Sequence, residues 1–124
     1  MAAWTSDELA RIEGADELRI ASLRRSGALG SPRTIWVVRI DDDLYIRSVR
    51  GRTSDWFGNT QVCHGGRIGA GGVERDVSFE DAAPDLADEI DAAYRTKYHR
   101  YAATIVNSVL TSEARSATLK LVPR

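Results

Sequence analysis

The stretch "TIWVVRIDDDLYIRSV", residues 34–49, decides how this sequence folds. Its first part, Thr34–Ile40, is short and rich in β-branched and aromatic residues, which favours a strand. Three aspartates then predict a turn, and Leu44–Val49 predicts the returning strand. Together the two segments form the clearest β-hairpin of the sequence.

The register of this hairpin determines which side chains share a face of the sheet. A three-residue turn places Thr34 opposite Arg50 on one face, with Ser48 next to them. The opposite parity would bury the Arg47 guanidinium, which is costly without a partner. We therefore predict the three-residue turn. Thr34, Ser48 and Arg50 would then converge at the open end of the hairpin. Arg47 would lie on the other face, as a surface or dimer-contact residue.

Weaker patterns predict the elements on either side of the hairpin. "TSDEL", residues 5–9, has the form of a capping box and predicts a helix over residues 6–13. "ELRIAS", residues 17–22, alternates apolar and polar residues and predicts the first strand. After the hairpin, a short helix capped by Ser54 or Asp55 ends at the Gly65-Gly66 pair. A glycine-rich turn at residues 69–72 then separates two short strands.

The C-terminal third predicts two helices and a final strand. A helical stripe recurs every four residues, at Leu86, Ile90, Tyr94 and Tyr98. Asp91 lies off this stripe and is expected to pair with Arg95 one turn later. A second helix follows around residues 105–110, and "SATLKLVP", residues 116–123, alternates as a strand does.

This order of elements predicts the fold class. It contains no βαβ rhythm, and its short strands are joined by glycine-rich turns. We therefore expect an α+β protein, mainly antiparallel β with helices, built on a small barrel. A length of 124 residues suits one domain over residues 1–124.

The composition excludes several classes of function. Seventeen basic and eighteen acidic residues leave a net charge of −1, which argues against bulk electrostatic capture of nucleic acid. Cys63 is the only cysteine, so we predict no disulfide, and without a zinc-type Cys/His array we predict no metal site. No apolar run is long enough to cross a bilayer, and the N-terminus lacks the apolar core of a signal peptide. We therefore expect a cytoplasmic protein with no membrane partner.

The segment after the hairpin, "RGRTSDWF", residues 50–57, concentrates groups that bind anions. Arg50 and Arg52 can each donate two hydrogen bonds to one phosphate. A helix that begins near Ser54 adds free N–H groups and a favourable dipole. Trp56, and Trp36 on the hairpin, offer flat apolar surface to an aromatic ring. These features predict a site for a phosphorylated ring compound. The alternative is that the arginines are solvated and the tryptophans lie in the core.

The same residues carry a resemblance to known families. The stretch "GSPRTIWVVRIDDDLYIRSVRGRTSDWFGN", residues 30–59, resembles the flavin-binding split-barrel superfamily, which includes pyridoxamine-phosphate oxidases and deazaflavin-dependent nitroreductases. The start "WTSDEL" and the end "RYAATIVNSVLTSEARSATLKLVPR", residues 100–124, resemble a bacterial family called domain of unknown function 2255. This second resemblance covers essentially the whole chain.

The resemblance implies a six-stranded split barrel that forms a homodimer, with a cofactor at the subunit interface. Carried over by position, Arg33 and Thr34 match the start of the first hairpin strand, and Trp56 matches the aromatic residue at the helix start. The residues that match the phosphate segment are Arg47, Ser48, Arg50, Arg52 and Ser54. Relatives often have small residues at positions 47 and 50, and their loop is longer. We therefore expect flavin mononucleotide (FMN) rather than a full-length deazaflavin cofactor.

These observations predict a protein that binds a phosphorylated flavin and, if it is an enzyme, acts as an oxidoreductase. No catalytic acid or base is identified. Two alternatives stay open: a cofactor-free module for a small phosphorylated or carboxylated ligand, and a haem-handling protein with His64 on the iron. A nucleophile–base pair of Cys63 and His64 is disfavoured, because adjacent side chains rarely point together. The tyrosines expected to pack rather than to donate protons are Tyr94, Tyr98 and Tyr101.

Overall fold

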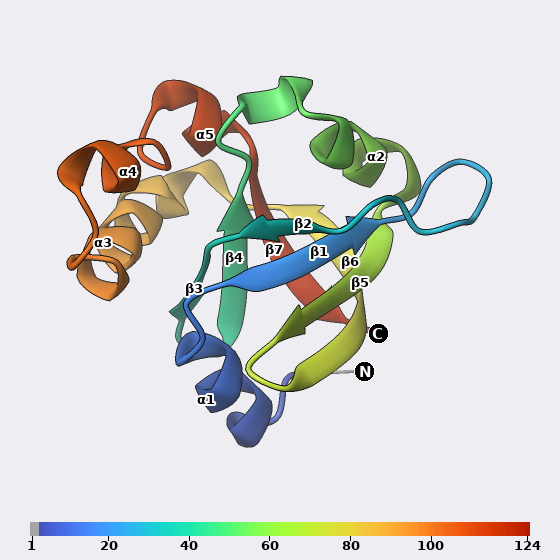
Figure 1. Ribbon diagram of the computed structural model, residues 1–124, viewed down its shortest axis with the longest axis horizontal. Helices are drawn as coiled ribbons and strands as arrows, with labels where there is room; N and C mark the ends of the chain where they lie inside the picture. Colours follow the sequence, from blue (N-terminus) through green and yellow to red (C-terminus); the bar gives the residue numbers. More distant parts are fainter. Residues whose placement is uncertain (1–2) are drawn as a thin grey trace.

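The computed structural model describes residues 3–124, which form one seven-stranded antiparallel sheet, curled into a nearly closed barrel, and five α-helices (Figure 1). The strands are β1 (Leu18–Ser22), β2 (Arg33–Ile35), β3 (Val37–Ile40), β4 (Asp43–Arg47), β5 (Gly65–Ala70), β6 (Val73–Asp81) and β7 (Thr118–Pro123). The helices are α1 (Ser6–Glu13), α2 (Asp55–Cys63), α3 (Ala87–Lys97), α4 (Ala103–Asn107) and α5 (Ser112–Ser116), with short 3-10 helices η1 (Gly51–Thr53) and η2 (Pro84–Leu86). The predicted α+β class and small antiparallel barrel are confirmed.

The sheet has the strand order β2-β1-β5-β6-β7-β4-β3. Its two edge strands, β2 and β3, are separated in the sequence only by Trp36. The single strand predicted over Thr34–Ile40 is therefore split: its first part pairs with β1 and its second part with β4. This split accounts for a seventh strand where six were expected.

The phenol of Tyr98 fills the break between β2 and β3. Its oxygen accepts a hydrogen bond from the Val37 N–H at 3.2 Å and donates to the Asp16 carbonyl at 2.8 Å. The neighbouring Lys97 Nζ donates to the Val37 carbonyl at 2.7 Å. Side chains from the end of α3 thus satisfy backbone groups that the sheet leaves free at the break.

Two apolar clusters lie on opposite faces of β3 and β4. Inside the barrel, inward-facing strand residues pack with α1 and with Phe57 of α2. Outside it, the predicted stripe of α3 packs against Val38 and Tyr45. In Figure 1, α1 lies below the barrel, α2 lies above it, and α3–α5 lie together on one side. The barrel therefore has one flank covered by helices.

The helix predictions hold where the pattern is local. The capping box is confirmed: Thr5 Oγ1 accepts from the Glu8 N–H at 3.1 Å, and Glu8 Oε1 accepts from the Thr5 N–H at 2.9 Å. The helix expected around residues 105–110 is instead the shorter α4, and α5 was not predicted. No helix in the part of the chain that the structure describes is both long and apolar enough to cross a membrane.

Candidate functional site

The hairpin turn has two residues, so the prediction of a three-residue turn is wrong. Ile40 pairs with Asp43 across the turn. Thr34 lies in β2, where it pairs with Arg19 of β1 rather than with Arg50. The predicted pairing of Thr34 with Arg50 is therefore wrong as well, because the strand breaks before it reaches that position.

Arg47 is buried, which corrects its predicted place at the surface or in a dimer contact. Its side chain is 0% exposed and forms an ion pair with the Asp91 carboxylate of α3. Its Nε donates to Thr118 Oγ1 at 3.0 Å, and its terminal nitrogens donate to the Val109 and Ala87 carbonyls at 2.8 and 3.1 Å. The register rejected on the sequence is thus the one adopted, because a distant carboxylate supplies the missing partner.

The local sequence pattern also predicted the wrong partner for Asp91. It does not pair with Arg95 but is buried between Arg47 and Arg115, whose Nη1 lies 3.3 Å from its carboxylate. Arg115 also pairs with Asp88 at 2.9 Å. This charge network ties α3 and α5 to the end of β4.

Four predicted site residues line one pocket between the loop of residues 23–32 and the start of α2. They are Arg33, Arg52, Ser54 and Trp56, and the pocket volume is about 650 Å³. The other lining residues are Ser22, Arg24, Arg25, Gly30, Ser31, Thr53, Asp55, Gly58, Asn59 and Val62. Four arginines therefore line a pocket whose lining includes one acidic residue, Asp55.

The arginines of this pocket differ in how firmly they are held. Arg52 donates to the Ser116 carbonyl at 2.8 Å and to Gln61 Oε1 at 3.0 Å, and its guanidinium carbon lies 5.1 Å from the centre of the Phe57 ring. Among residues 3–124, no carboxylate pairs with Arg24, Arg25 or Arg33. The pocket therefore combines one fixed guanidinium with three whose donors are free for a ligand.

The start of α2 contributes backbone donors to the same pocket. Ser54 precedes the helix, but its side chain does not cap it. Its hydroxyl instead lies 2.8 Å from the hydroxyl of Ser48, which is buried behind it. The first N–H groups of α2 have no side-chain acceptor, and a helix N-terminus of this kind attracts anions. The buried Ser48 thus helps to hold Ser54, the residue before α2, in place.

Three other predicted residues lie outside this pocket. Thr34 lines a separate groove with Arg19 and the turn at residues 69–74. Trp36 stacks on Tyr98, with ring centres 3.8 Å apart and planes at 5°. Arg50 is exposed at the start of η1. Their predicted contacts with a ligand stay predictions.

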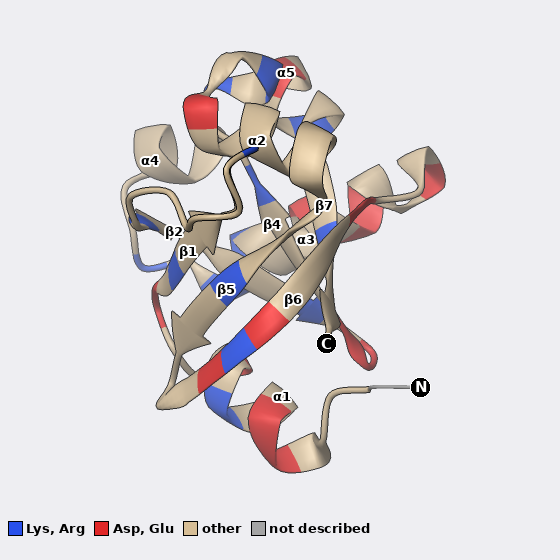
Figure 2. Ribbon diagram, turned by 90° about the vertical axis from the view of Figure 1, so that its right-hand side faces the viewer, with Lys and Arg blue, Asp and Glu red and all other residues tan. Residues whose placement is uncertain are grey.

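Arg24 and Arg25 are pocket residues that the sequence prediction missed. The signal was an adjacent arginine pair at the start of a loop that carries two glycines and a proline, "RRSGALGSPR". It was not recognised because the sequence does not reveal that this loop lies beside α2. Figure 2 shows basic and acidic residues interspersed over the face in view, so the positive charge of the pocket is local.

The remaining candidates lie elsewhere. His64 is exposed and ends α2 with a φ of 56°, beside a groove lined by Glu80 and Asp81. No group of three or more metal-ligating side chains occurs within residues 3–124. Tyr94 and Tyr98 are buried, and burial raises the pKa of both phenols above the ordinary value. Such phenols remain protonated and pack in the core.

Comparison with known proteins identifies a family and a fold. The family described as "Uncharacterized protein conserved in bacteria (DUF2255)" matches residues 8–121. A search of curated proteins gave no match. Among solved structures, the conserved hypothetical protein Rv2991 from Mycobacterium tuberculosis has a TM-score of 0.73 at 11% identity, covering 100% of this chain and 82% of that one.

Two further neighbours have the same fold at similarly low identity. A putative pyridoxamine 5'-phosphate oxidase from Listeria innocua has a TM-score of 0.65 at 13% identity, over 94% of this chain and 90% of that one. HutZ, the heme storage protein from Vibrio cholerae, has a TM-score of 0.65 at 10% identity, covering 99% of this chain and 92% of that one. An F420 reductase and a FAD-binding protein from Mesorhizobium loti also share the fold. The expected split-barrel architecture is confirmed.

Proposed function

The chain belongs to the bacterial family DUF2255, and we propose that it binds a phosphorylated flavin, with FMN as the smallest suitable ligand. The phosphate would lie in the pocket between the 23–32 loop and α2. The observation that carries this proposal is the set of four arginines that line that pocket beside a helix start with no side-chain cap. Its split-barrel neighbours, which include a FAD-binding protein, support the choice of a flavin.

The donors of the pocket suit the phosphate end of a flavin. Arg52 is held by Ser116 and Gln61, so it loses little conformational freedom when an anion binds. Arg33 can turn a free guanidinium toward the same anion, and the first N–H groups of α2 complete the donor set. Trp56 offers half-buried aromatic surface at the pocket wall.

We further propose that the protein is a homodimer with the flavin ring at the interface. Leu29, Val49 and Val62 are large apolar residues that remain exposed in the single chain, and Val62 also lines the pocket. A second subunit covering this surface would provide the apolar wall that an isoalloxazine ring needs. The oligomeric state in solution, measured by light scattering, tests this part of the proposal.

A bound flavin would supply hydride or single-electron chemistry, so we propose that the protein acts as a cytoplasmic oxidoreductase. The chain itself contributes the positive charge that holds the phosphate. It also contributes Ser48 and Ser54, which fix the start of α2. No residue is assigned as the catalytic acid or base.

The first experiment is an absorption spectrum of the purified protein, followed by titration with FMN and riboflavin. We expect FMN to bind more tightly than riboflavin, because riboflavin lacks the phosphate. Arg33→Ala should weaken FMN binding about tenfold and riboflavin binding little, as loss of one charge-assisted hydrogen bond predicts. Arg50→Ala applies the same comparison to the predicted phosphate role of Arg50, and equal losses for both flavins would end that role.

A cofactor-free module is distinguished by thermal unfolding. If phosphate or sulfate raises the melting temperature while neither flavin does, the pocket binds an anion but no flavin. Failure of FMN to bind at tens of micromolar concentration would falsify the flavin proposal.

Haem handling is a second candidate, favoured by the likeness to the heme storage protein HutZ. Its predicted iron ligand, His64, is exposed and accessible. Glu80 and Asp81 line the adjacent groove, however, and would repel the haem propionates. We therefore rank haem below flavin. A Soret band on haem addition that disappears in His64→Ala would reverse this order.

A further inference from the structure

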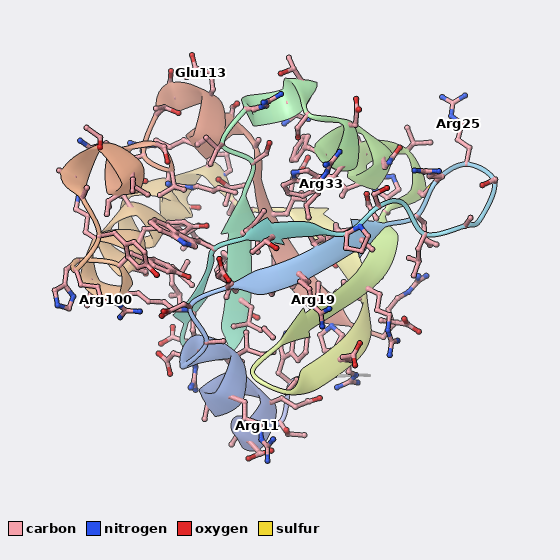
Figure 3. All side chains as sticks on the ribbon, viewed as in Figure 1. Arg11, Arg19, Arg25, Arg33, Arg100 and Glu113 are labelled. Carbon is pink, nitrogen blue, oxygen red and sulfur yellow. The ribbon has the colours of Figure 1, made fainter. Side chains whose placement is uncertain are left out.

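The backbone that carries Arg52 is packed tightly against α5. Gly51, the residue before it, has a φ of 70°, and a Cβ atom placed there would lie 3.0 Å from Glu113 Cβ and 3.2 Å from the Glu113 carbonyl oxygen. In Figure 3 the labelled Glu113 of α5 lies beside the η1 turn. Glycine suits both this φ and this close approach. The base of the Arg52 side chain is therefore fixed before a ligand binds.

The guanidinium group of Arg52 is held by two uncharged oxygens. Its Nη1 donates to the Ser116 carbonyl at 2.8 Å, and its Nη2 donates to Gln61 Oε1 at 3.0 Å. These two bonds leave the Nε hydrogen and one hydrogen on each terminal nitrogen for a ligand. A carboxylate in either place would hold Arg52 equally well but would neutralise its charge. The two acceptors thus restrain the arginine and keep its positive charge available to an anion.

The Gln61 amide is itself oriented by a carboxylate. Its Nε2 donates to Oδ1 of Asp81, the last residue of β6, at 3.2 Å. An arginine can only donate and an ionised carboxylate can only accept, so the amide turns Oε1 to Arg52 and Nε2 to Asp81. Gln61 is half-buried, whereas Arg52 and Asp81 are exposed. A chain of hydrogen bonds therefore runs from β6 through α2 to the pocket arginine.

We propose that Gln61 is a positioning residue for the anion pocket, and that Asp81 fixes the direction in which the Gln61 amide points. Gln61 is not among the residues that line the pocket beside α2, so it would act on a ligand through Arg52. An arginine that is already ordered loses less side-chain entropy when it binds an anion. This inference rests on the proposed anion site and adds the residues that prepare Arg52 for it.

Titration of the wild type, Gln61→Met, Arg52→Ala and the double variant with FMN and riboflavin tests the role of Gln61. Methionine keeps the length of the side chain but offers Arg52 no amide oxygen. Gln61→Met should weaken FMN binding about threefold, the cost of ordering one flexible side chain, and leave riboflavin binding unchanged. In the Arg52→Ala background the same substitution should have no further effect, because Gln61 acts through Arg52. Circular dichroism verifies that each variant is folded.

Asp81→Ala separates orientation from simple charge. Removal of an acidic residue should strengthen the binding of an anion if charge alone matters. Loss of the hydrogen bond to Gln61 predicts the opposite, a fall in FMN affinity of about twofold with no change for riboflavin. The matched control is Glu80→Ala, which removes the same charge from the neighbouring exposed residue of the same groove. It should not weaken FMN binding.

The outcomes decide each part of the proposal. Equal losses for the two flavins, an unchanged FMN affinity in Gln61→Met, or a further loss in the Arg52→Ala background overturns the positioning role. An FMN affinity in Asp81→Ala equal to or above that in Glu80→Ala removes Asp81 from it. If the wild type does not bind FMN, the flavin proposal fails, and protection against thermal unfolding by inorganic phosphate repeats the comparison. Weaker protection in Gln61→Met then keeps the positioning role, whereas no protection of the wild type ends it.

Discussion

Arg47 and the arginines of the pocket occupy opposite environments in one small protein. Arg47 is 0% exposed and donates to a carboxylate, a hydroxyl and two carbonyls. Arg24, Arg25 and Arg33 are exposed and pair with no carboxylate among residues 3–124. A buried guanidinium must have its partners supplied by the chain, whereas a surface guanidinium keeps its donors for a ligand. The same side chain therefore serves stability in one place and binding in the other.

The largest expected effect is on stability, in Arg47→Ala. Removal of the guanidinium leaves Asp91 in a buried position with its main partner lost, which typically costs about 3–5 kcal/mol. Unfolding in urea, followed by circular dichroism, measures the change in free energy. Arg33→Ala is the matched control and should change it by less than about 0.5 kcal/mol. Similar losses of unfolding free energy in Arg47→Ala and Arg33→Ala would contradict the proposed difference between buried and exposed arginines.

A double substitution separates the value of the pair from the cost of breaking it. Replacing Arg47 by Met and Asp91 by Leu removes both charges and keeps apolar volume. Such replacements are often neutral relative to the original pair, so the double variant should regain most of the stability that Arg47→Ala loses. A double variant as unstable as the single one would show that the neutral hydrogen bonds of Arg47 dominate.

Arg52 stands between the two environments, because it lines the pocket and also donates to Ser116 and Gln61. Arg52→Ala should weaken FMN binding about tenfold and destabilise the fold by about 1 kcal/mol. The same titration and urea experiments measure both effects. An FMN affinity equal to that of the wild type would place Arg52 with the structural residues.

Lys97 is a half-buried cation whose nearest partner is a carbonyl, and its titration offers a pH test. Burial lowers the pKa of Lys97 to about 8, from 10.5 for a free lysine. Between these values the unfolded chain binds the proton and the folded chain does not, so stability contributed at this site rises with pH. Relative to Lys97→Met, the wild-type protein should become more stable from pH 8 to 10.5 and show a constant difference below pH 8. A stability difference between the wild type and Lys97→Met that does not change from pH 8 to 10.5 would contradict the lowered pKa of Lys97.

The smallest expected effect is that of salt. The screening length falls from about 10 Å at 0.1 M to about 3 Å at 1 M ionic strength. FMN affinity should therefore fall several-fold over this range, because the pocket arginines are exposed. The destabilisation caused by Arg47→Ala should change little, because buried pairs are screened much less by salt than exposed charges are. Equal salt dependence of the two would mean that burial does not separate them.

Patterns among neighbouring residues predicted individual elements of the fold well, because such elements depend mainly on the local sequence. The capping box of Thr5 and Glu8 and the stripe of α3 both appear as expected. The hairpin register failed for the opposite reason: it depends on Asp91, which lies 44 residues from Arg47 in the chain. No spacing rule within the hairpin reports a carboxylate on a helix that is formed later.

The candidate site was predictable only in part, for a related reason. Arg52, Ser54 and Trp56 surround a helix start, and a helix start is a local feature. Arg24 and Arg25 join them only because the barrel brings the 23–32 loop to α2. Trp36 stacks on Tyr98, since the break between β2 and β3 turns it toward α3, and its predicted contact with a ligand stays a prediction. Pairing across the barrel decides these placements, and a single sequence does not display it.

The position of β7 has a consequence for how the protein folds. This strand pairs with β6 on one side and with β4 on the other, although it follows β4 by some 70 residues: Arg47 pairs with Thr118. Contacts of such high sequence separation slow folding, because a long chain segment must be closed before they form. Until β7 is in place, β4 and β6 each expose an unpaired edge that can pair with another chain. Aggregation during slow refolding, rather than loss of the finished barrel, is therefore the main hazard that this topology creates.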